Sequence, residues 1–224
     1  MAQMTSQTEY REEESSAIAN PGPLGLLLLA LTTALVGANF ARFLIPGVFM
    51  GIGTVIAPVL VYGGVIQVLA GMWAFRKNNT LGATLFSAYG GFLIAFGVLF
   101  LPALGLVTLF GSDIRAFNHT LGLFFLCWTI CCGVLFLGAL RANKLLAAVL
   151  AFLCLTYLFL AIGEFANANT TLLAIGGWLG VVCALIAWYA ALAGILQATR
   201  SPFQLPMGER RGAPAHPFGG EPAV

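Results

Sequence analysis

Long apolar runs fill most of the chain, and short clusters of charged residues separate them. Arg42 and Arg76, for example, bracket thirty-three residues that carry no charge. An α-helix needs about 20 apolar residues to cross the roughly 30 Å hydrocarbon core of a bilayer. The runs therefore predict six membrane-spanning helices, near residues 23–42, 50–75, 80–105, 120–140, 145–163 and 172–197.

The composition indicates the same class of protein. Hydrophobic residues make up 60% of the 224 positions and charged residues 8%, whereas soluble domains carry about 25% charged residues. Because so few polar residues cannot cover the apolar ones in water, we expect an all-α integral membrane protein. We expect a polar cytoplasmic N-terminal tail over 1–19, a six-helix transmembrane domain over 20–199 and a Pro/Gly-rich cytoplasmic C-terminal tail over 200–224.

The basic residues predict the orientation. If both termini face the cytoplasm, eight basic residues lie on that side: Arg11, Arg76, Lys77, Arg141, Lys144, Arg200, Arg210 and Arg211. Arg42 and Arg115 then lie on the other side. This bias follows the positive-inside rule for short loops, so we expect a multi-pass protein of a plasma or bacterial inner membrane. The net charge of +2 reflects this topology and does not indicate a nucleic-acid partner.

Two further patterns bear on how the helices pack. Small residues recur along the last span at alternating spacings of three and four, at Gly177, Gly180, Ala184, Ala187, Ala191 and Gly194. Such a stripe predicts a close contact between helix backbones within the bilayer. Pro58 in the middle of the second span, followed by Gly63 and Gly64, predicts a break in that helix because proline lacks the backbone N–H.

The predicted spans lack the residues that most membrane chemistry requires. They hold no lysine, no histidine deep in the bilayer and no grouping of nucleophile, base or metal ligands, so we expect no enzyme activity, cofactor or metal. Cys127 and Cys131 share a helix face, and we interpret them as small apolar core residues. Glu164, at the outer end of the fifth span, is the one carboxylate close to the hydrocarbon. A side-chain proton relay across the whole bilayer is therefore not expected.

The polar groups inside the spans are neutral hydroxyls and amides. Most serines and threonines in such helices bond to their own backbone, but Gln67 and Tyr89 each carry a bulky polar group that needs a partner. A path lined by such groups suits a small solute that is neutral or weakly anionic. From the residues alone we therefore expect a transporter or channel for a small molecule.

The opening of the first span carries a recognisable motif. Residues 20–26, Asn-Pro-Gly-Pro-Leu-Gly-Leu, resemble the signature of the acetate uptake transporter family, the succinate–acetate permeases. Further segments resemble that family in order and with compatible spacing: Tyr62-Gly63-Gly64 with Gln67 and Ala70-Gly71, Asn79-Thr80 through Tyr89-Gly90, Leu160-Ala161-Ile162-Gly163, Gly177-Trp178 with Gly180, and Leu205-Pro206 with Gly208. The resemblance covers about residues 20 to 208.

This resemblance implies transport of acetate and related short monocarboxylates or dicarboxylates such as succinate, in a channel-like or proton-linked way. It also implies a hexameric ring of six-helix protomers in the lipid bilayer, with a pathway through each protomer. The narrowest point of the pathway is expected at Leu29, Tyr89 and Leu153, and Asn20 at its cytoplasmic mouth. Further pathway candidates are Thr32, Thr33, Gln67, Thr84 and Glu164.

Two positions depart from the pattern of the family. Leu29 stands where an aromatic residue is usual, a difference expected to change gating or to admit larger acids. Glu164 stands where a neutral asparagine is common. The simpler interpretation of Glu164 is a water-exposed acid at a helix end. The functional hypothesis is that it favours uptake of the protonated acid at low external pH. The spans lack other proton carriers, so a linked proton is expected to travel on the carboxyl group of the substrate, unless an anion stays hydrogen-bonded throughout its passage.

Two alternatives remain open at this stage. The neutral lining also fits a channel for small neutral solutes such as urea or ammonia. A close-packed bundle without a permeable path would instead indicate a membrane scaffold that transports nothing.

Overall fold

The computed structural model describes residues 18–42, 52–101, 104 and 107–206. Most of the two tails expected at 1–19 and 200–224 therefore lies outside the described residues, as do residues 102–103 and 105 of the third predicted span.

Six long apolar helices, each long enough to cross a membrane, make up the described structure. Five of them are the continuous helices α2 (Gly22–Phe40), α5 (Thr80–Leu99), α6 (Ile114–Ala139), α7 (Lys144–Phe165) and α8 (Thr170–Ala198). The second span is composite, and a short 3₁₀ helix, η3 (Val107–Phe110), precedes α6. The predicted fold class, an all-α protein with six spans, is confirmed.

Asn and Asp side chains set the start of four helices. Each side chain accepts a hydrogen bond from a backbone N–H in the first turn of the helix that follows, at Asn79, Asp113, Asn143 and Asn169. This bond satisfies a donor that has no partner within the helix. Because Asp113 caps α6, this helix begins at Ile114. The prediction that it begins near 120 was wrong by about one and a half turns.

The second span changes its helical pattern at the predicted proline. The segment α3 (Ile52–Pro58) ends at Pro58, a π-helical segment η1 (Val59–Ile66) follows, and α4 (Gln67–Arg76) completes the span. Proline cannot donate the hydrogen bond of a continuous α-helix, and π-type turns often mark such interruptions. The predicted break is confirmed, in the form of a π-helix.

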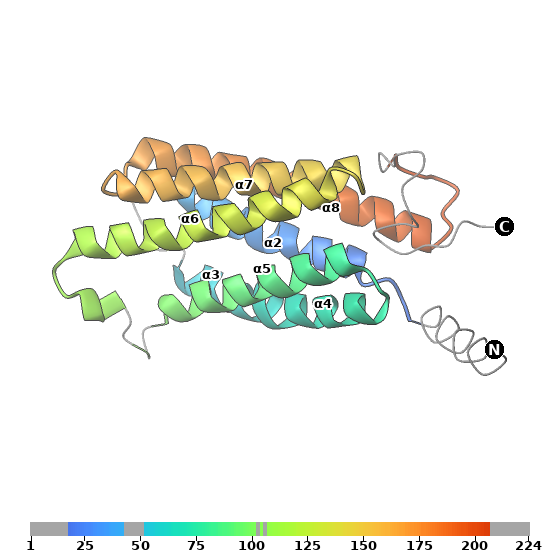
Figure 1. Cartoon of the computed structure of the whole chain (residues 1–224), viewed down its shortest axis with the longest axis horizontal. Helices are drawn as coiled ribbons and strands as arrows, with labels where there is room; N and C mark the ends of the chain where they lie inside the picture. Colours follow the sequence, from blue (N-terminus) through green and yellow to red (C-terminus); the bar gives the residue numbers. More distant parts are fainter. Residues whose placement is uncertain (1–17, 43–51, 102–103, 105–106, 207–224) are drawn as a thin grey trace.

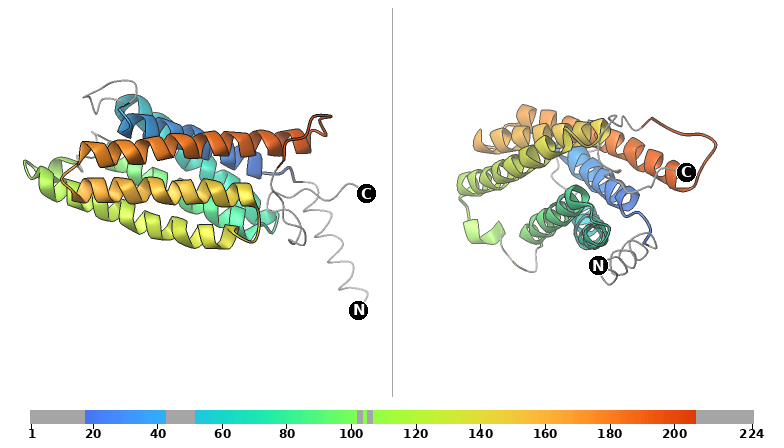
Figure 2. Two further views of the ribbon diagram at one scale, coloured as in Figure 1. Left: turned by 90° about the horizontal axis from the view of Figure 1, so that it is seen from above. Right: turned by 45° about the vertical axis from the view of Figure 1, so that its right-hand side comes forward.

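Helix α2 lies at the centre of the bundle. The right-hand view of Figure 2 shows it between the layer of α6, α7 and α8 and the pair formed by α4 and α5 (Figure 1). Gly37 of α2 meets Gly177 of α8 so closely that a Cβ added at Gly177 would lie 2.6 Å from the Gly37 carbonyl oxygen. The predicted close contact along the small residues of α8 is thus confirmed.

Large apolar side chains cover much of the outside of the bundle. Trp73, Trp178 and Leu185 are 50%, 49% and 57% exposed, as expected for helices that face lipid or another protein. Cys127 and Cys131 also lie on the exposed surface, so their interpretation as core residues was wrong. Their sequence positions allow either face of an apolar helix, and in α6 both lie on an exposed face.

The bundle has two ends, the Gly22 end and the Glu164 end. The Gly22 end holds the first residues of α2 and the last of α8, and the Glu164 end holds the first residues of α6 and the last of α7 (Figure 1).

Candidate functional site

A buried hydroxyl pair joins α2 to α5 inside the bundle. The Oγ1 of Thr33 and the Oη of Tyr89 lie 2.7 Å apart, at hydrogen-bonding distance. Tyr89 is fully buried and Thr33 is 3% exposed. The hydroxyl of Tyr89, which the sequence marked as needing a partner, finds one fifty-six residues away in the chain.

Aromatic side chains from three helices surround this pair. We call Tyr89, Phe92, Trp128 and Tyr157 the aromatic cluster. Phe92 stacks on Trp128 with ring centroids 4.5 Å apart and meets Tyr157 edge-on at 5.0 Å, and Tyr89 lies 6.0 Å from Trp128. The Nε1 of Trp128 is buried and has no hydrogen-bond partner. The cluster thus combines apolar faces with one unused donor.

Leu29 and Leu153 pack in the same core as Tyr89, and both are fully buried. Leu29 precedes Thr33 by one helical turn, and Leu153 precedes Tyr157 by one turn, so each shares a face with a residue of the hydroxyl pair or the aromatic cluster. The three residues expected at the constriction therefore project from α2, α5 and α7 into one closed core.

The further pathway candidates occupy different environments. Thr32 is fully buried, and its hydroxyl donates to the Leu28 carbonyl oxygen at 2.8 Å. Thr84 lies on an exposed part of α5, where its hydroxyl donates to the Thr80 carbonyl oxygen at 2.8 Å. At the Gly22 end, the Oδ1 of Asn20 accepts a hydrogen bond from the backbone N–H of Gly22 at 2.9 Å.

Gln67 is a fully buried amide at the junction of η1 and α4. Neither its Oε1 nor its Nε2 has a hydrogen-bond partner. One turn earlier in the same span, a Cβ added at Gly63 would lie 2.6 Å from Cγ2 of Thr32 and 2.5 Å from Cδ1 of Leu93. Gln67 therefore follows a point where η1 approaches both α2 and α5. An unpartnered buried amide is costly, which makes it a natural place for a polar ligand.

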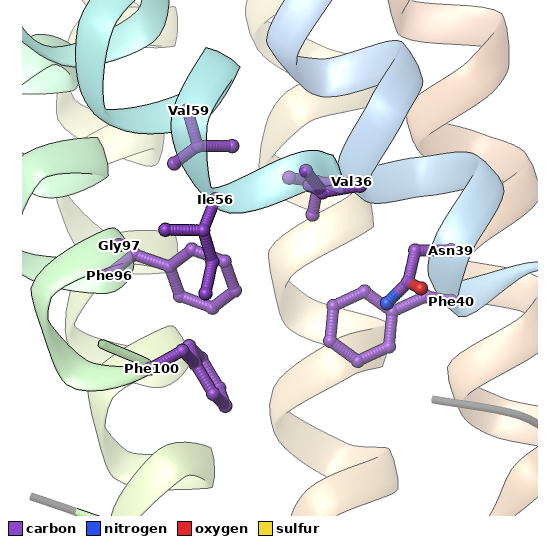
Figure 3. A pocket seen from close by; sticks show the side chains of 9 residues that line it. Val36, Asn39, Phe40, Ile56, Val59, Phe96, Gly97 and Phe100 are labelled. Carbon is purple, nitrogen blue, oxygen red and sulfur yellow. The ribbon is translucent and has the colours of Figure 1, made fainter. Parts of the chain in front are cut away.

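Phenylalanines fill much of the space between the aromatic cluster and the Glu164 end. The space there measures about 0 Å³, too small for a water molecule, and is lined by Val36, Phe92, Leu93, Phe96, Phe125 and Tyr157. Next to it, Phe40, Phe96 and Phe100 project between α2 and α5 around a cavity of about 20 Å³ (Figure 3). We call this stretch the phenylalanine passage. Both spaces are too small for a short carboxylic acid.

A larger and more polar cavity lies at the Glu164 end. It has a volume of about 230 Å³, and we call it the Glu164 vestibule. Its polar lining residues are Asn39, Arg42, Asn118 and Glu164. Glu164 is only 4% exposed and Asn118 8%, so the interpretation of Glu164 as a water-exposed acid was wrong. The last turn of α7 turns the side chain inward, against α6 and the start of α8.

The sequence interpretation missed several residues of this site. Phe92, Trp128 and Tyr157 surround Tyr89, and Asn118 lines the vestibule. A signal was present for some of them, because aromatic residues recur every three or four positions along α5 and at its C-cap, at Tyr89, Phe92, Phe96 and Phe100. In an apolar helix such a stripe is indistinguishable from ordinary core packing, because nothing in the sequence shows that α6 brings a tryptophan against it.

The fold and the site define a class of protein. Six apolar spans surround a buried hydroxyl pair, and a polar vestibule opens at one end of the bundle. This is a multi-pass membrane protein of the transporter and channel type. The chain belongs to the GPR1/FUN34/yaaH family, whose sequence profile matches residues 2–209, as the motifs beginning at Asn20 indicate.

Named relatives and a solved structure agree with this assignment. The chain is 34% identical over 213 residues to Acetate permease A of Emericella nidulans, covering 88% of this chain and 68% of that protein. It is 32% identical over 197 residues to the succinate-acetate/proton symporter SatP of Escherichia coli, covering 87% and 98%. The structure of the bacterial acetate channel SatP matches with a TM-score of 0.74 and 30% identity, over 85% of this chain and 99% of that one.

Proposed function

We propose that this protein transports acetate and related short carboxylates, including succinate, across a cell membrane through a pathway within each protomer. The pathway runs from the Glu164 vestibule through the phenylalanine passage to the level of Leu29, Tyr89 and Leu153, and leaves near Asn20. The buried Thr33–Tyr89 hydroxyl pair at 2.7 Å carries the proposal, because it offers hydrogen bonds to a carboxyl group inside a mostly apolar core. The relatives named for acetate and succinate support it.

The arrangement in the membrane is part of the same proposal. Both tails face the cytoplasm, as the basic residues indicate, so the Glu164 vestibule opens to the outside. The exposed apolar face of α8, with Trp178 at 49% and Leu192 at 49%, suits lipid or the neighbouring protomer of a hexameric ring. The protein acts as a transporter and not as an enzyme, and it needs no cofactor.

The pathway uses most of the candidate residues. Gln67 and the pair of Thr32 and Thr33 lie buried beside the constriction, and they supply neutral polar groups to a passing carboxyl group. Thr84 is left out, because its hydroxyl is exposed and bonded within α5. Since no carboxylate lies at this depth, a linked proton travels on the substrate itself.

The direct test is flux of labelled acetate into proteoliposomes at several pH gradients. We expect saturable uptake that unlabelled succinate and acetate inhibit. A neutral-solute channel is the second candidate, because the Thr33–Tyr89 pair is uncharged and serves a neutral amide equally well. Under that candidate, urea would inhibit acetate uptake as strongly as acetate does. If the purified protein carried neither solute, the scaffold interpretation would replace both.

The replacement Gln67→Leu separates the effect of this residue on stability from its effect on acetate transport. Leucine removes an unpartnered amide that costs about 1–3 kcal/mol while buried, so the melting temperature should stay the same or rise. Acetate flux should fall at least tenfold, a loss of about 1.4 kcal/mol of stabilisation for the passing carboxyl group. The two measurements are thermal unfolding in detergent and proteoliposome flux. Unchanged flux with raised stability would exclude Gln67 from the pathway.

A further inference from the structure

The Glu164 vestibule contains a buried acid that the protein itself leaves without a partner. The side chain of Glu164 is 96% buried on the last turn of α7 and lines the cavity of about 230 Å³. Among the described residues, its carboxyl group makes no ion pair and no hydrogen bond. Its oxygens are accessible from the cavity, so a ligand that brings a hydrogen-bond donor into the vestibule can reach them.

The other polar groups of the cavity are hydrogen-bond donors. Asn118 reaches it from α6, and Asn39 and Arg42 reach it from the end of α2. Arg42 lines the same cavity as Glu164 without pairing with it. A molecule that accepts hydrogen bonds from an amide or a guanidinium and donates one to a carboxylate therefore matches the cavity at both sides.

The remaining ionisable groups at this end lie outside the cavity. On α6 and its N-cap these are Asp113, Arg115 and His119, and none of them lines the vestibule. Asp113 accepts a hydrogen bond from the Ala116 N–H at 2.9 Å, and the ring of His119 lies 6.1 Å from that of Phe165. The first turn of α8, from Thr170, carries no ionisable side chain. Glu164 and Arg42 are thus the two charged residues that face a ligand here.

We infer that the Glu164 vestibule binds a short carboxylic acid together with one proton, which the carboxyl groups of Glu164 and of the ligand share. The shared proton lies between the two carboxyl groups, and the carbonyl oxygen of the acid accepts from the side chains of Asn118 and Arg42. Without this proton, two ionised carboxylates meet in the cavity as like charges. The cavity of about 230 Å³ has room for a small acid. The inference rests on the proposed function and assigns to it the species that is bound first.

A small ammonium-type cation is the other ligand that a carboxylate and two aromatic rings would suit. Phe40 and Phe117 line the vestibule and would attract such a cation. Arg42 lies in the same cavity and repels it, whereas the guanidinium favours the carbonyl oxygen of an acid. The lining therefore favours the acid over the cation.

The test is exchange of labelled acetate across proteoliposomes with the same pH on both sides, so that neither the orientation of the protein nor a gradient affects the result. Between about pH 5.5 and about pH 7.5 the un-ionised fraction of a carboxylic acid falls about 100-fold. For the parent protein we expect the half-saturating concentration of total acetate to rise at least about tenfold over this range, and for Glu164→Gln less than about threefold. Glutamine keeps the shape of the side chain and removes the charge that rejects acetate anion.

The matched control is Asp113→Asn, which removes one negative charge at the same end and keeps a side chain that can cap α6. It should behave like the parent. The inference is overturned if the parent protein and Glu164→Gln show the same pH dependence of the half-saturating acetate concentration. It is also overturned if Asp113→Asn changes this pH dependence as much as Glu164→Gln does, or if methylammonium competes with acetate in the parent. A parent protein that exchanges no acetate would instead overturn the proposed function.

A second variant keeps the inference testable if Glu164→Gln does not fold. Asn118→Leu removes one of the donors to the carbonyl oxygen of the acid. We expect it to raise the half-saturating acetate concentration at about pH 5.5 by about tenfold, or about 1.4 kcal/mol. An unchanged half-saturating concentration in this variant would overturn the inference by itself.

Discussion

Replacement of Tyr89 by alanine is expected to remove the size filter of the pathway. Tyr89 is fully buried, bonds to Thr33 at 2.7 Å and packs against Trp128, so its removal leaves a cavity at the level where we propose that the pathway narrows. A steric filter worth about 1–3 kcal/mol corresponds to a selectivity of about 10–200-fold. The ratio of benzoate to acetate uptake by proteoliposomes should therefore rise at least tenfold. The same cavity should lower the free energy of unfolding by about 3 kcal/mol.

Tyr189→Ala is the control for this experiment. Tyr189 lies on α8, and its hydroxyl donates to the Pro206 carbonyl oxygen at 3.2 Å, away from the aromatic cluster. Its removal should leave the benzoate-to-acetate ratio unchanged. A Tyr89→Ala protein that still excludes benzoate would show that the pathway does not narrow at Tyr89. Tyr89→Phe, which keeps the ring and removes the hydroxyl, should keep the size filter and lose part of the acetate flux.

The second large effect is expected at the contact of α2 and α8. A methyl group at Gly177 would lie against the backbone nitrogen of Ala41 and 2.6 Å from the carbonyl oxygen of Gly37. Because these are backbone atoms, no side chain can move aside, and the two helices must separate. Overpacking of this kind costs about 3 kcal/mol. For Gly177→Ala we therefore expect the melting temperature to fall by about 6–12 °C.

Gly133→Ala provides the comparison, because a Cβ added there meets nothing within 4 Å. Alanine has a higher helix propensity than glycine by about 1 kcal/mol, so this replacement should raise the melting temperature by a few degrees. The melting temperatures of the two variants, each with one added methyl group, should thus change in opposite directions. Equal shifts would mean that the contact of α2 and α8 yields to a methyl group and does not hold the bundle together.

The six spans were predictable because hydrophobic length is a local property of the chain. The start of α6 was not found, because the polar and charged residues before position 120 do not continue the apolar pattern, although Asp113 is a recognisable N-cap. A side-chain cap can start a helix several residues before the apolar run begins. The break after Pro58 was predictable for the same local reason, but the π-helical form it takes depends on how η1 packs against α2 and α5.

The site was only partly predictable. The resemblance named Leu29, Tyr89 and Leu153 as the constriction, and this stays a prediction. The neighbours of Tyr89 come from positions far away in the chain. Thr33 and Trp128 meet it only because α2 and α6 pack against the same face of α5. The burial of Glu164 was likewise hidden, because the last turn of an apolar helix can point a carboxyl group to water or inward. The inward direction follows from how α7 packs against α6 and α8.

The phenylalanine passage has a consequence for the energy supply of the cell. Protons cross membranes rapidly along files of hydrogen-bonded water, and a stretch of about 0 Å³ between Phe96, Phe125 and Tyr157 leaves no room for such a file. In this conformation the protein is therefore expected to hold back protons as well as solutes. We then expect a cell to be able to keep many copies in its membrane without discharging the electrochemical gradient on which ATP synthesis depends.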